Sequence, residues 1–142
     1  MRLCAHRDVS ASVHEMIIIH SKDAYVRPHQ HLNKSESYHI IEGLADLVTF
    51  TDDGRLTQVT RIGDHRSGAP FYCRVSSSGY HTLRIVSDWL VFHESTSGPF
   101  RKEDTVYAPW APAEEDREAV GRFLETLRDQ CDGSETRSAL RL

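Results

Sequence analysis

The most informative stretch of the sequence is residues 27–43, RPHQHLNKSESYHIIEG. His29 and His31 are two residues apart, and side chains at that spacing point to the same face of a strand, so both imidazoles can reach one ion. The polar bend Asn33-Lys34-Ser35 then lets the chain turn and re-enter the sheet, which directs the Glu36 carboxylate back to the same point. Two histidines and one carboxylate predict a metal site that leaves several coordination positions open.

A fourth ligand is expected from a later part of the chain. His81 opens a strand-like run directly after the turn-forming residues 76–79, and it is the best candidate on an opposing strand. A histidine pair alone arises often by chance, but the additional residues in register favour a metal site. The predicted ligands are His29, His31, Glu36 and His81. Imidazole and carboxylate suit zinc, iron, nickel and manganese alike, so the sequence predicts one divalent transition metal ion without naming it.

Most of the chain before Pro112 reads as short β-strands separated by turns. The strand-like runs are Val13–His20, Tyr38–Ile41, Leu44–Phe50, Leu56–Ile62, Phe71–Val75, His81–Val86 and Trp89–Glu94. Turn signals such as Asp52-Asp53-Gly54 lie between them. Because no helical segment separates consecutive strands, a parallel α/β sheet is excluded. The sequence predicts an all-β protein with an antiparallel sandwich or barrel.

One amphipathic helix is expected near the C-terminus, over residues 113–130. The apolar residues at helical spacing are Val120, Phe123, Leu124 and Leu127. We expect the helix to pack outside the barrel through these side chains. Residues 107–112, YAPWAP, predict a rigid connector, because each proline pushes the preceding residue into extended geometry. A single domain over residues 1–132 accounts for the pattern, and residues 133–142 are expected to form a flexible tail.

Composition and charge exclude several classes of protein. The 142 residues carry a formal net charge of −4, with 39% hydrophobic and 27% charged residues, as in an ordinary globular domain. The mild acidity and the absence of a Lys/Arg run argue against a nucleic-acid partner. The longest apolar stretch, Met16–Ile19, is far shorter than the roughly 20 residues of a membrane span, so no membrane partner is expected.

The cysteines and the N-terminus indicate a cytoplasmic protein. The three cysteines are scattered, which is typical of reduced thiols, and the first residues contain no apolar run that could act as a secretory signal. The apolar strand Val13–Ile19 could pair across a homodimer interface, which would bury an edge that otherwise invites aggregation.

The spacing of the predicted ligands resembles that of the cupin family, whose first motif reads H-x-H-x(3,4)-E-x(6)-G. The motif fits residue for residue at His29, His31, Glu36 and Gly43. The second cupin motif, which ends in a turn and a ligand histidine, fits residues 76–81 only loosely. Other cupin positions depart, because an expected glycine is Asp23 and an expected asparagine is Ile85. The resemblance implies a jelly-roll barrel that contains a metal ion.

Four separated segments resemble the WbuC-type cupin-fold metalloproteins more closely. They are residues 27–36, Tyr80-His81-Thr82, Gly98-Pro99-Phe100 and Ala108-Pro109-Trp110-Ala111-Pro112. The resemblance implies a small single-domain cupin, often encoded beside surface-polysaccharide genes, whose activity is poorly defined. It therefore supplies a site without supplying a reaction.

Four further residues are candidates around the predicted metal. Tyr25 and Arg27 share the alternation parity of the H-x-H pair and are expected to face the same cavity. Arg27 could hold the carboxylate or phosphate of a substrate, with a structural salt bridge as an equal alternative. Lys34 is a second substrate-binding candidate, with a solvated side chain as the alternative. Tyr25 and His93 are candidates for moving a proton, and His93 is not expected to bind the metal.

Two classes of function remain open at this point. The first is a metal-dependent enzyme acting on a small polar or anionic metabolite, such as a sugar derivative or natural-product precursor, with isomerase, lyase or dioxygenase chemistry. The second is a non-catalytic metalloprotein in which the ion binds a small ligand or supports the barrel. A structural zinc site is normally closed and often contains thiolates. The predicted ligand set contains no cysteine, which favours a catalytic or ligand-binding site.

Overall fold

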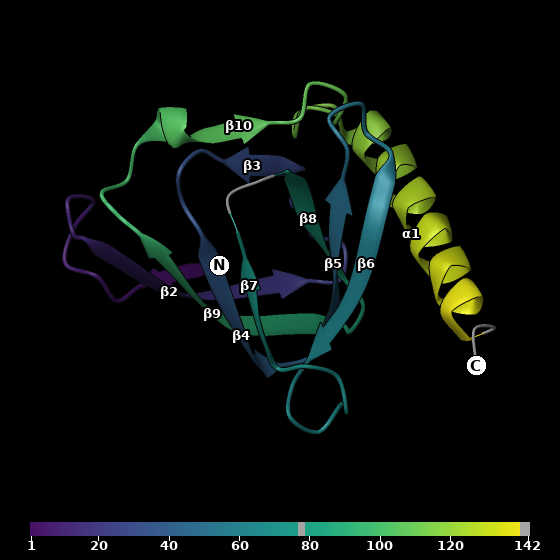
Figure 1. The fold of residues 1–142 in the computed structure, drawn as a ribbon, viewed down its shortest axis with the longest axis horizontal. Helices are drawn as coiled ribbons and strands as arrows, with labels where there is room; N and C mark the ends of the chain where they lie inside the picture. The colour runs from purple at the N-terminus through teal and green to yellow at the C-terminus, as the bar shows by residue number, and fades with distance from the viewer. Residues whose placement is uncertain (77–78, 140–142) are drawn as a thin grey trace.

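A computed structural model describes residues 1–76 and 79–139, and in it two antiparallel sheets face each other with one α-helix outside them (Figure 1). Sheet A contains β1 (Arg2–Cys4), β2 (Val13–Ser21), β9 (Trp89–Ser97), β4 (Glu36–Glu42) and β7 (Tyr72–Val75), in that order. Sheet B contains β10 (Thr105–Tyr107), β3 (His29–His31), β8 (Tyr80–Ile85), β5 (Leu44–Phe50) and β6 (Leu56–Gly63), in that order. The predicted all-β antiparallel jelly-roll is therefore confirmed.

Apolar side chains fill the space between the sheets. Sheet A contributes Met16, Ile18, Tyr38, Ile40, Leu90 and Phe92. Sheet B contributes Ala45, Leu47, Ile62, Leu83 and Ile85. Within β2 and β9 buried residues alternate with more exposed ones, as expected for strands with one face on a core. This alternation determines which polar residues of the same strands point to the interior.

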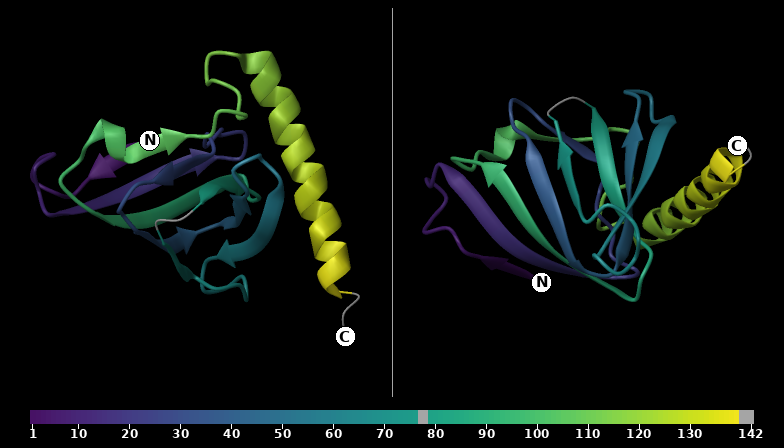
Figure 2. Two further views of the ribbon diagram at one scale, coloured as in Figure 1. Left: turned by 45° about the horizontal axis from the view of Figure 1, so that its top comes forward. Right: turned by 60° about the horizontal axis from the view of Figure 1, so that its bottom comes forward.

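The helix α1 (Arg117–Ala139) lies outside the strands (Figure 2). It packs on the outer face of sheet B through a second apolar cluster, made of Val48, Phe50, Tyr80, Ala108, Ala111, Leu127 and Cys131. Of the residues predicted to dock the helix, Leu127 is buried, and Phe123 packs half-buried against the cluster. The predicted position of the helix is confirmed. No helix in the described part of the chain has the length and hydrophobicity of a membrane span.

The helix begins later than residue 113, where the sequence predicted its start. Residues 113–116 form a turn closed by a hydrogen bond from the Asp116 N–H to the Ala113 carbonyl, 3.1 Å long. The Asp116 carboxylate accepts a second hydrogen bond from the Ala119 N–H at 3.0 Å. An aspartate in this position caps a helix, which explains why the first helical residue is Arg117.

The helix also continues past residue 130, to Ala139. Gly133 was expected to mark its end, but a glycine inside a helix costs only about 1 kcal/mol, which the flanking helical residues outweigh. The tail predicted over residues 133–142 therefore begins as helix. Residues 140–142 lie outside the described residues.

A buried carboxylate connects the helix to sheet B. Asp46 on β5 is fully buried and accepts a hydrogen bond from the Nε of Arg84 on β8 at 2.8 Å. The same Arg84 donates from Nη1 to the carboxylate of Asp132 on α1, also at 2.8 Å. Burying a charge is tolerated when it is paired, and here the pairing joins β5, β8 and α1.

The edge expected to pair across a homodimer is covered in the structure. β1 lies beside β2, with Leu3 opposite Ile17, so β2 has a neighbour on each side. The sequence did not predict this strand, because residues 2–4 are too few to show periodicity. The homodimer itself stays a prediction.

We predict that Leu127→Ala lowers the free energy of unfolding by about 2–5 kcal/mol, because it leaves a cavity under the helix. Denaturant unfolding followed by circular dichroism measures this change. Glu125→Ala, on the exposed side of α1, is the matched control and should stay within about 0.5 kcal/mol of the wild type. An equal effect of the two substitutions would contradict the proposed packing.

Candidate metal centre

The four predicted ligands come together in the structure. His29 and His31 lie on β3, His81 on β8 and Glu36 at the start of β4. β3 and β8 pair with His29 directly opposite His81. One ligand atom from each of the four residues can be chosen so that all lie within 4.8 Å of one another. A group of this size could hold one metal ion.

Hydrogen bonds orient the three imidazoles. The Nδ1 atoms of His29 and His81 lie 2.8 Å and 3.4 Å from the backbone carbonyl oxygen two residues earlier in the chain. A carbonyl only accepts, so each Nδ1 is the donor and each Nε2 keeps its lone pair. The Nδ1 of His31 lies 3.1 Å from the hydroxyl of Thr105 on β10. All three rings therefore present Nε2 to the centre of the group, as metal-binding histidines do.

The carboxylate of Glu36 is held between these rings. Its Oε2 accepts a hydrogen bond from the Tyr38 hydroxyl at 2.5 Å and lies 3.4 Å from Nε2 of His81. Its Oε1 lies 2.8 Å from Nε2 of His31. The contact is an ion pair and not a hydrogen bond, so this buried nitrogen has no hydrogen-bond partner among the described residues. A buried orphan nitrogen beside a carboxylate fits a bound cation better than it fits a closed polar cluster.

The charge states of His29 and Glu36 also suit a cation, whereas at His31 burial is outweighed by the adjacent Glu36, which raises the pKa of this imidazole, so that binding of a cation would displace a proton from it. Burial and the nearby His81 lower the pKa of His29 to about 4, so that this imidazole is neutral at neutral pH. Burial alone would raise the pKa of Glu36, but the adjacent His31 and His81 outweigh it and hold that pKa far below its usual range. Neutral imidazole nitrogens and an ionised carboxylate are ligands that divalent transition metals accept.

The glycine of the predicted motif has a steric reason. Gly43 has a φ of 96°, a conformation that other residues rarely adopt. A Cβ at this position would lie 2.2 Å from the carbonyl oxygen of Trp89. Gly43 therefore permits the close turn between β4, which contains Glu36, and β5.

Tyr25 and Arg27 do not share the strand face of the two histidines, because β3 begins only at His29. The Tyr25 hydroxyl donates to the Pro112 carbonyl at 2.9 Å, and burial raises the pKa of this phenol to about 12. The guanidinium carbon of Arg27 lies 4.8 Å from the centre of the Tyr107 ring. Both side chains therefore contact the segment that leads to the helix.

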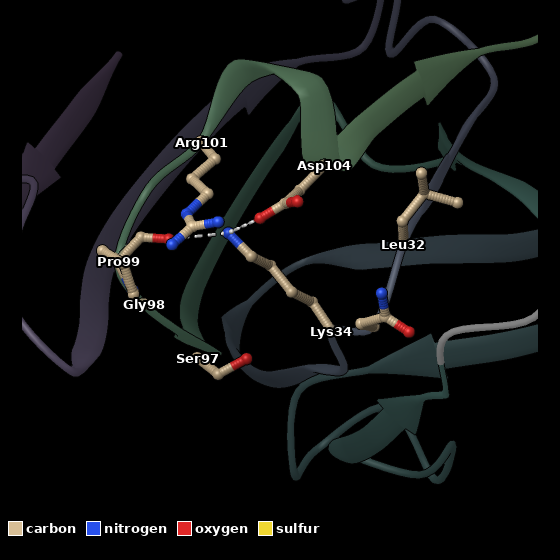
Figure 3. A pocket seen from close by; sticks show the side chains of 8 residues that line it. Leu32, Lys34, Ser97, Gly98, Pro99, Arg101 and Asp104 are labelled. Atoms are coloured by element: carbon tan, nitrogen blue, oxygen red, sulfur yellow. Dashed lines mark hydrogen bonds and ion pairs between the residues drawn. The ribbon is translucent and has the colours of Figure 1, made fainter.

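Two polar contacts fix the Lys34 side chain beside a surface cavity of about 250 Å³ (Figure 3). Its ammonium donates to the Pro99 carbonyl at 2.9 Å and lies 3.0 Å from the Asp104 carboxylate. The cavity is lined by Leu32, Asn33, Lys34, Ser97, Gly98, Pro99, Arg101 and Asp104. With both contacts made, Lys34 holds the bend after β3 against the segment before β10. Its role in substrate binding stays a prediction.

His93 lies on the outer face of sheet A, whereas its neighbour Glu94 faces inward. Leu90, Phe92 and Glu94 are the buried residues of β9, so the alternation places His93 on the other side. Its Nε2 lies 3.7 Å from the carboxylate of Glu15, which is on the same outer face. The side chain of His93 therefore does not point toward the four predicted ligands.

Glu94 is the polar residue that the sequence reasoning missed. It lies opposite Met16 on one side and Tyr38 on the other, both core residues, and its side chain makes no hydrogen bond or ion pair within the part of the chain that the structure describes. Burial and the nearby Glu36 carboxylate raise the pKa of Glu94 to about 7. The alternation of Leu90 and Phe92 could have revealed it.

Comparison of the sequence with known proteins gives a partial match. Residues 1–62 match the model of a domain of unknown function (DUF6016). That region includes three of the four predicted ligands but not His81. No curated protein matches the sequence.

Comparison with solved structures identifies the architecture. A protein of Shewanella oneidensis has a TM-score of 0.61 at 13% identity, and the match covers 75% of this chain and 72% of that chain. A Klebsiella pneumoniae protein described as having a double-stranded β-helix domain has a TM-score of 0.57 at 11% identity, over 76% of this chain and 78% of that one. The chain has a cupin fold. The cupin part of the predicted resemblance is confirmed, and the WbuC-type assignment stays a prediction.

A well-known enzyme is among the similar structures. Oxalate decarboxylase of Bacillus subtilis, described as having Mn(II) centres, has a TM-score of 0.53 at 22% identity to this chain. The match covers 70% of this chain but only 24% of that chain. At these identities the similarity shows the fold alone.

We predict that Tyr38→Phe weakens metal binding by about 10–100-fold, because it removes the hydroxyl that orients the Glu36 carboxylate. Titration of metal-free protein with a divalent ion measures the change. Tyr72→Phe removes an exposed hydroxyl in sheet A and should leave the affinity unchanged. Equal affinities of wild type and Tyr38→Phe would mean that the hydroxyl does not orient a ligand.

We predict that Glu94→Gln makes the metal-free protein relatively more stable as the pH rises. The pKa of Glu94 is about 7 in the folded chain and 4.5 ordinarily. As the pH rises from 4.5 to 7, the carboxyl ionises in the unfolded chain but stays protonated in the folded one, so the folded state of the wild type loses stability. The amide does not ionise, and its advantage should grow to roughly 3 kcal/mol by pH 8. Unfolding at pH 5 and pH 8 tests this, with Glu125→Gln as the exposed control. An advantage independent of pH would contradict the assignment.

Proposed function

We propose that this cupin is a metal-dependent enzyme acting on a small polar or anionic metabolite. The observation that carries the proposal is the convergence of three imidazole Nε2 atoms and the Glu36 carboxylate, with the buried Nε2 of His31 2.8 Å from that carboxylate and without a hydrogen bond in the described chain. The hydrogen bonds to the three Nδ1 atoms orient these donors toward the same point. The group would hold one divalent transition metal ion.

The ligand set supports a catalytic ion better than a structural one. His29, His31, Glu36 and His81 include no thiolate, and three imidazoles with one carboxylate suit metals that take five or six ligands. When bound, such an ion can act as a Lewis acid or lower the pKa of a bound water. The Mn(II) centres of the Bacillus subtilis oxalate decarboxylase make manganese the first metal to test, followed by iron, zinc and nickel.

Glu94 is our candidate for the group that moves a proton. Its carboxyl is buried on the inner face of sheet A, next to the Tyr38 that holds Glu36. No protein donor or acceptor within the described residues engages it, so it is free to exchange a proton with a bound molecule. A carboxyl with a pKa near 7 can act as an acid or a base at neutral pH. Glu94 therefore replaces His93 and Tyr25 as the leading candidate.

Arg27 remains our candidate for holding an anionic group of the substrate. The Tyr107 ring lies 6.2 Å from the His29 ring and 4.8 Å from the Arg27 guanidinium carbon, so Arg27 lies one aromatic ring away from the metal ligands. Its Nε is buried without a hydrogen-bond partner in the described chain. Isomerase, lyase and dioxygenase reactions are all compatible with these groups.

We predict that His31→Ala removes most of the bound metal while the barrel stays folded, because the core between the sheets does not include the site. Elemental analysis after loading with manganese, iron, zinc or nickel measures the metal, and circular dichroism measures the fold. His39→Ala, on the outer face of β4, is the matched control and should retain the metal. Undiminished metal content in His31→Ala would exclude this centre.

We predict that Glu94→Gln keeps the metal and lowers turnover by about 10²–10⁴-fold, the usual effect of losing an acid–base group. The assay follows conversion of small carboxylic acids and sugar derivatives by the metal-loaded protein. The wild-type rate should also change with pH near 7, and the variant should lose that dependence. Ligand binding by the wild type without any turnover would support the non-catalytic alternative instead.

A further inference from the structure

The outer face of sheet A presents large apolar side chains to solvent. The most exposed lie on four of its strands or directly beside them, and each is between 47% and 65% exposed. They are Leu3, Ile41, Phe71, Tyr72 and Trp89. The outer face of sheet B differs, because α1 covers it (Figure 2). Large exposed apolar side chains gathered on one face are typical of an interaction site.

The strand register shows how the outward-facing residues of sheet A line up across its strands. Ile17 on β2 lies beside His93 on β9, which lies beside His39 on β4, which lies beside Tyr72 on β7. Leu3 on β1 lies beside Ile17, so this outward-facing row crosses five strands, with apolar residues at both ends and two histidines between them. Closer to Trp89, the outward-facing residues Ile19 on β2 and Val91 on β9 lie side by side.

A second row on this face carries opposite charges at its two ends. Glu15 on β2 pairs with Ser95, Ser95 with Ser37, and Ser37 with Arg74 on β7. Both ends reach solvent, since the Glu15 side chain is half exposed and Arg74 is exposed. The two small serines between them leave the middle of the row free of charge. A negative end and a positive end make this row complementary to a reversed copy of itself.

We propose that the outer face of sheet A is a homodimer interface, occupied by a second copy of this chain. The two-fold axis would run parallel to the strands, between β9 and β4. Such an axis reverses each row, so Glu15 faces the partner subunit's Arg74, and this pair occurs twice. The same operation places Ile17 opposite the partner subunit's Tyr72. Sheets that pack face to face lie about 10 Å apart, a gap that long glutamate and arginine side chains can cross.

The charge pattern is what favours a second copy over another partner. An unrelated protein would need only an apolar surface, whereas the Glu15–Arg74 row already supplies both halves of two ion pairs. Near the axis the two rows contain His93, His39, Ser95 and Ser37, and the exposed apolar side chains lie around them, so polar and apolar contacts would both contribute to the interface. This interface uses the outer face of sheet A, whereas the dimer expected from the sequence used the edge of β2. It does not depend on the proposed metal chemistry.

The first test is the mass of the purified, metal-loaded protein, measured by light scattering over a range of concentrations. We expect twice the chain mass of 16.2 kDa. Trp89→Lys and Tyr72→Lys each place a charge in the apolar surface and should give monomers that keep their circular dichroism spectrum and metal content. Glu118→Lys, on the exposed side of α1, should remain a dimer. A wild-type monomer at all concentrations, or a dimer unaffected by both surface variants, would overturn the proposal.

The second test examines the orientation of the two copies. Glu15→Arg and Arg74→Glu should each weaken the dimer by about tenfold or more, because each places like charges opposite each other twice. The double variant exchanges the two charges and should restore dimerisation toward the wild-type level. Sedimentation velocity gives the dissociation constants. Failure of the exchange to restore the dimer would overturn the proposed axis.

Discussion

The direct opposition of His29 and His81 in neighbouring strands is the constraint on which the metal centre depends. β3 is only three residues long and is held between β10 and β8. Its position therefore comes from these two neighbours and not from its own length. Glu36 reaches the same point from sheet A, so the group joins the two sheets. A shift of one residue in β3 would turn both of its histidines to the other face.

The inner and outer faces of each sheet present different kinds of polar residue, and β8 and β9 each show both kinds. On β8 the imidazole of His81 joins the ligand group, while Arg84 pairs with the buried Asp46 and with the helix. On β9 the carboxyl of Glu94 faces inward, while His93 lies on the outer face. The fold therefore keeps the inner polar groups apart from the outer contacts, although the same strands contain both.

The metal ligands could be predicted from the sequence because their geometry is local or repeats every two residues. The surrounding residues could not be predicted so directly. Arg27 and Tyr25 were placed by extending the H-x-H alternation backwards, but Pro28 has no N–H to continue the ladder, and β3 starts after it. Glu94 follows the same alternation as Leu90 and Phe92, but the sequence analysis assigned the proton-transfer role to the neighbouring His93.

Secondary-structure elements were predicted well where many residues contribute to a periodic pattern and poorly where few do. The long strands and the amphipathic helix follow from periodicity summed over several turns or pleats. β1 and β10 have three residues each, too few for a pattern, and their positions depend on distant partners. The ends of α1 depended on single interactions, the Asp116 cap and the tolerance of Gly133, that propensity alone does not resolve.

The separation of the ligands along the chain has a consequence for biosynthesis. Glu36 and His81 are 45 residues apart, and β3 gains its neighbours only when β8 and β10 have emerged. A nascent chain that ends before β8 contains the histidine pair and the carboxylate but has no strand to align them. Contacts between distant segments form late in folding. The four candidate ligands therefore meet only after the barrel closes, and the complete group cannot form on an unfinished chain.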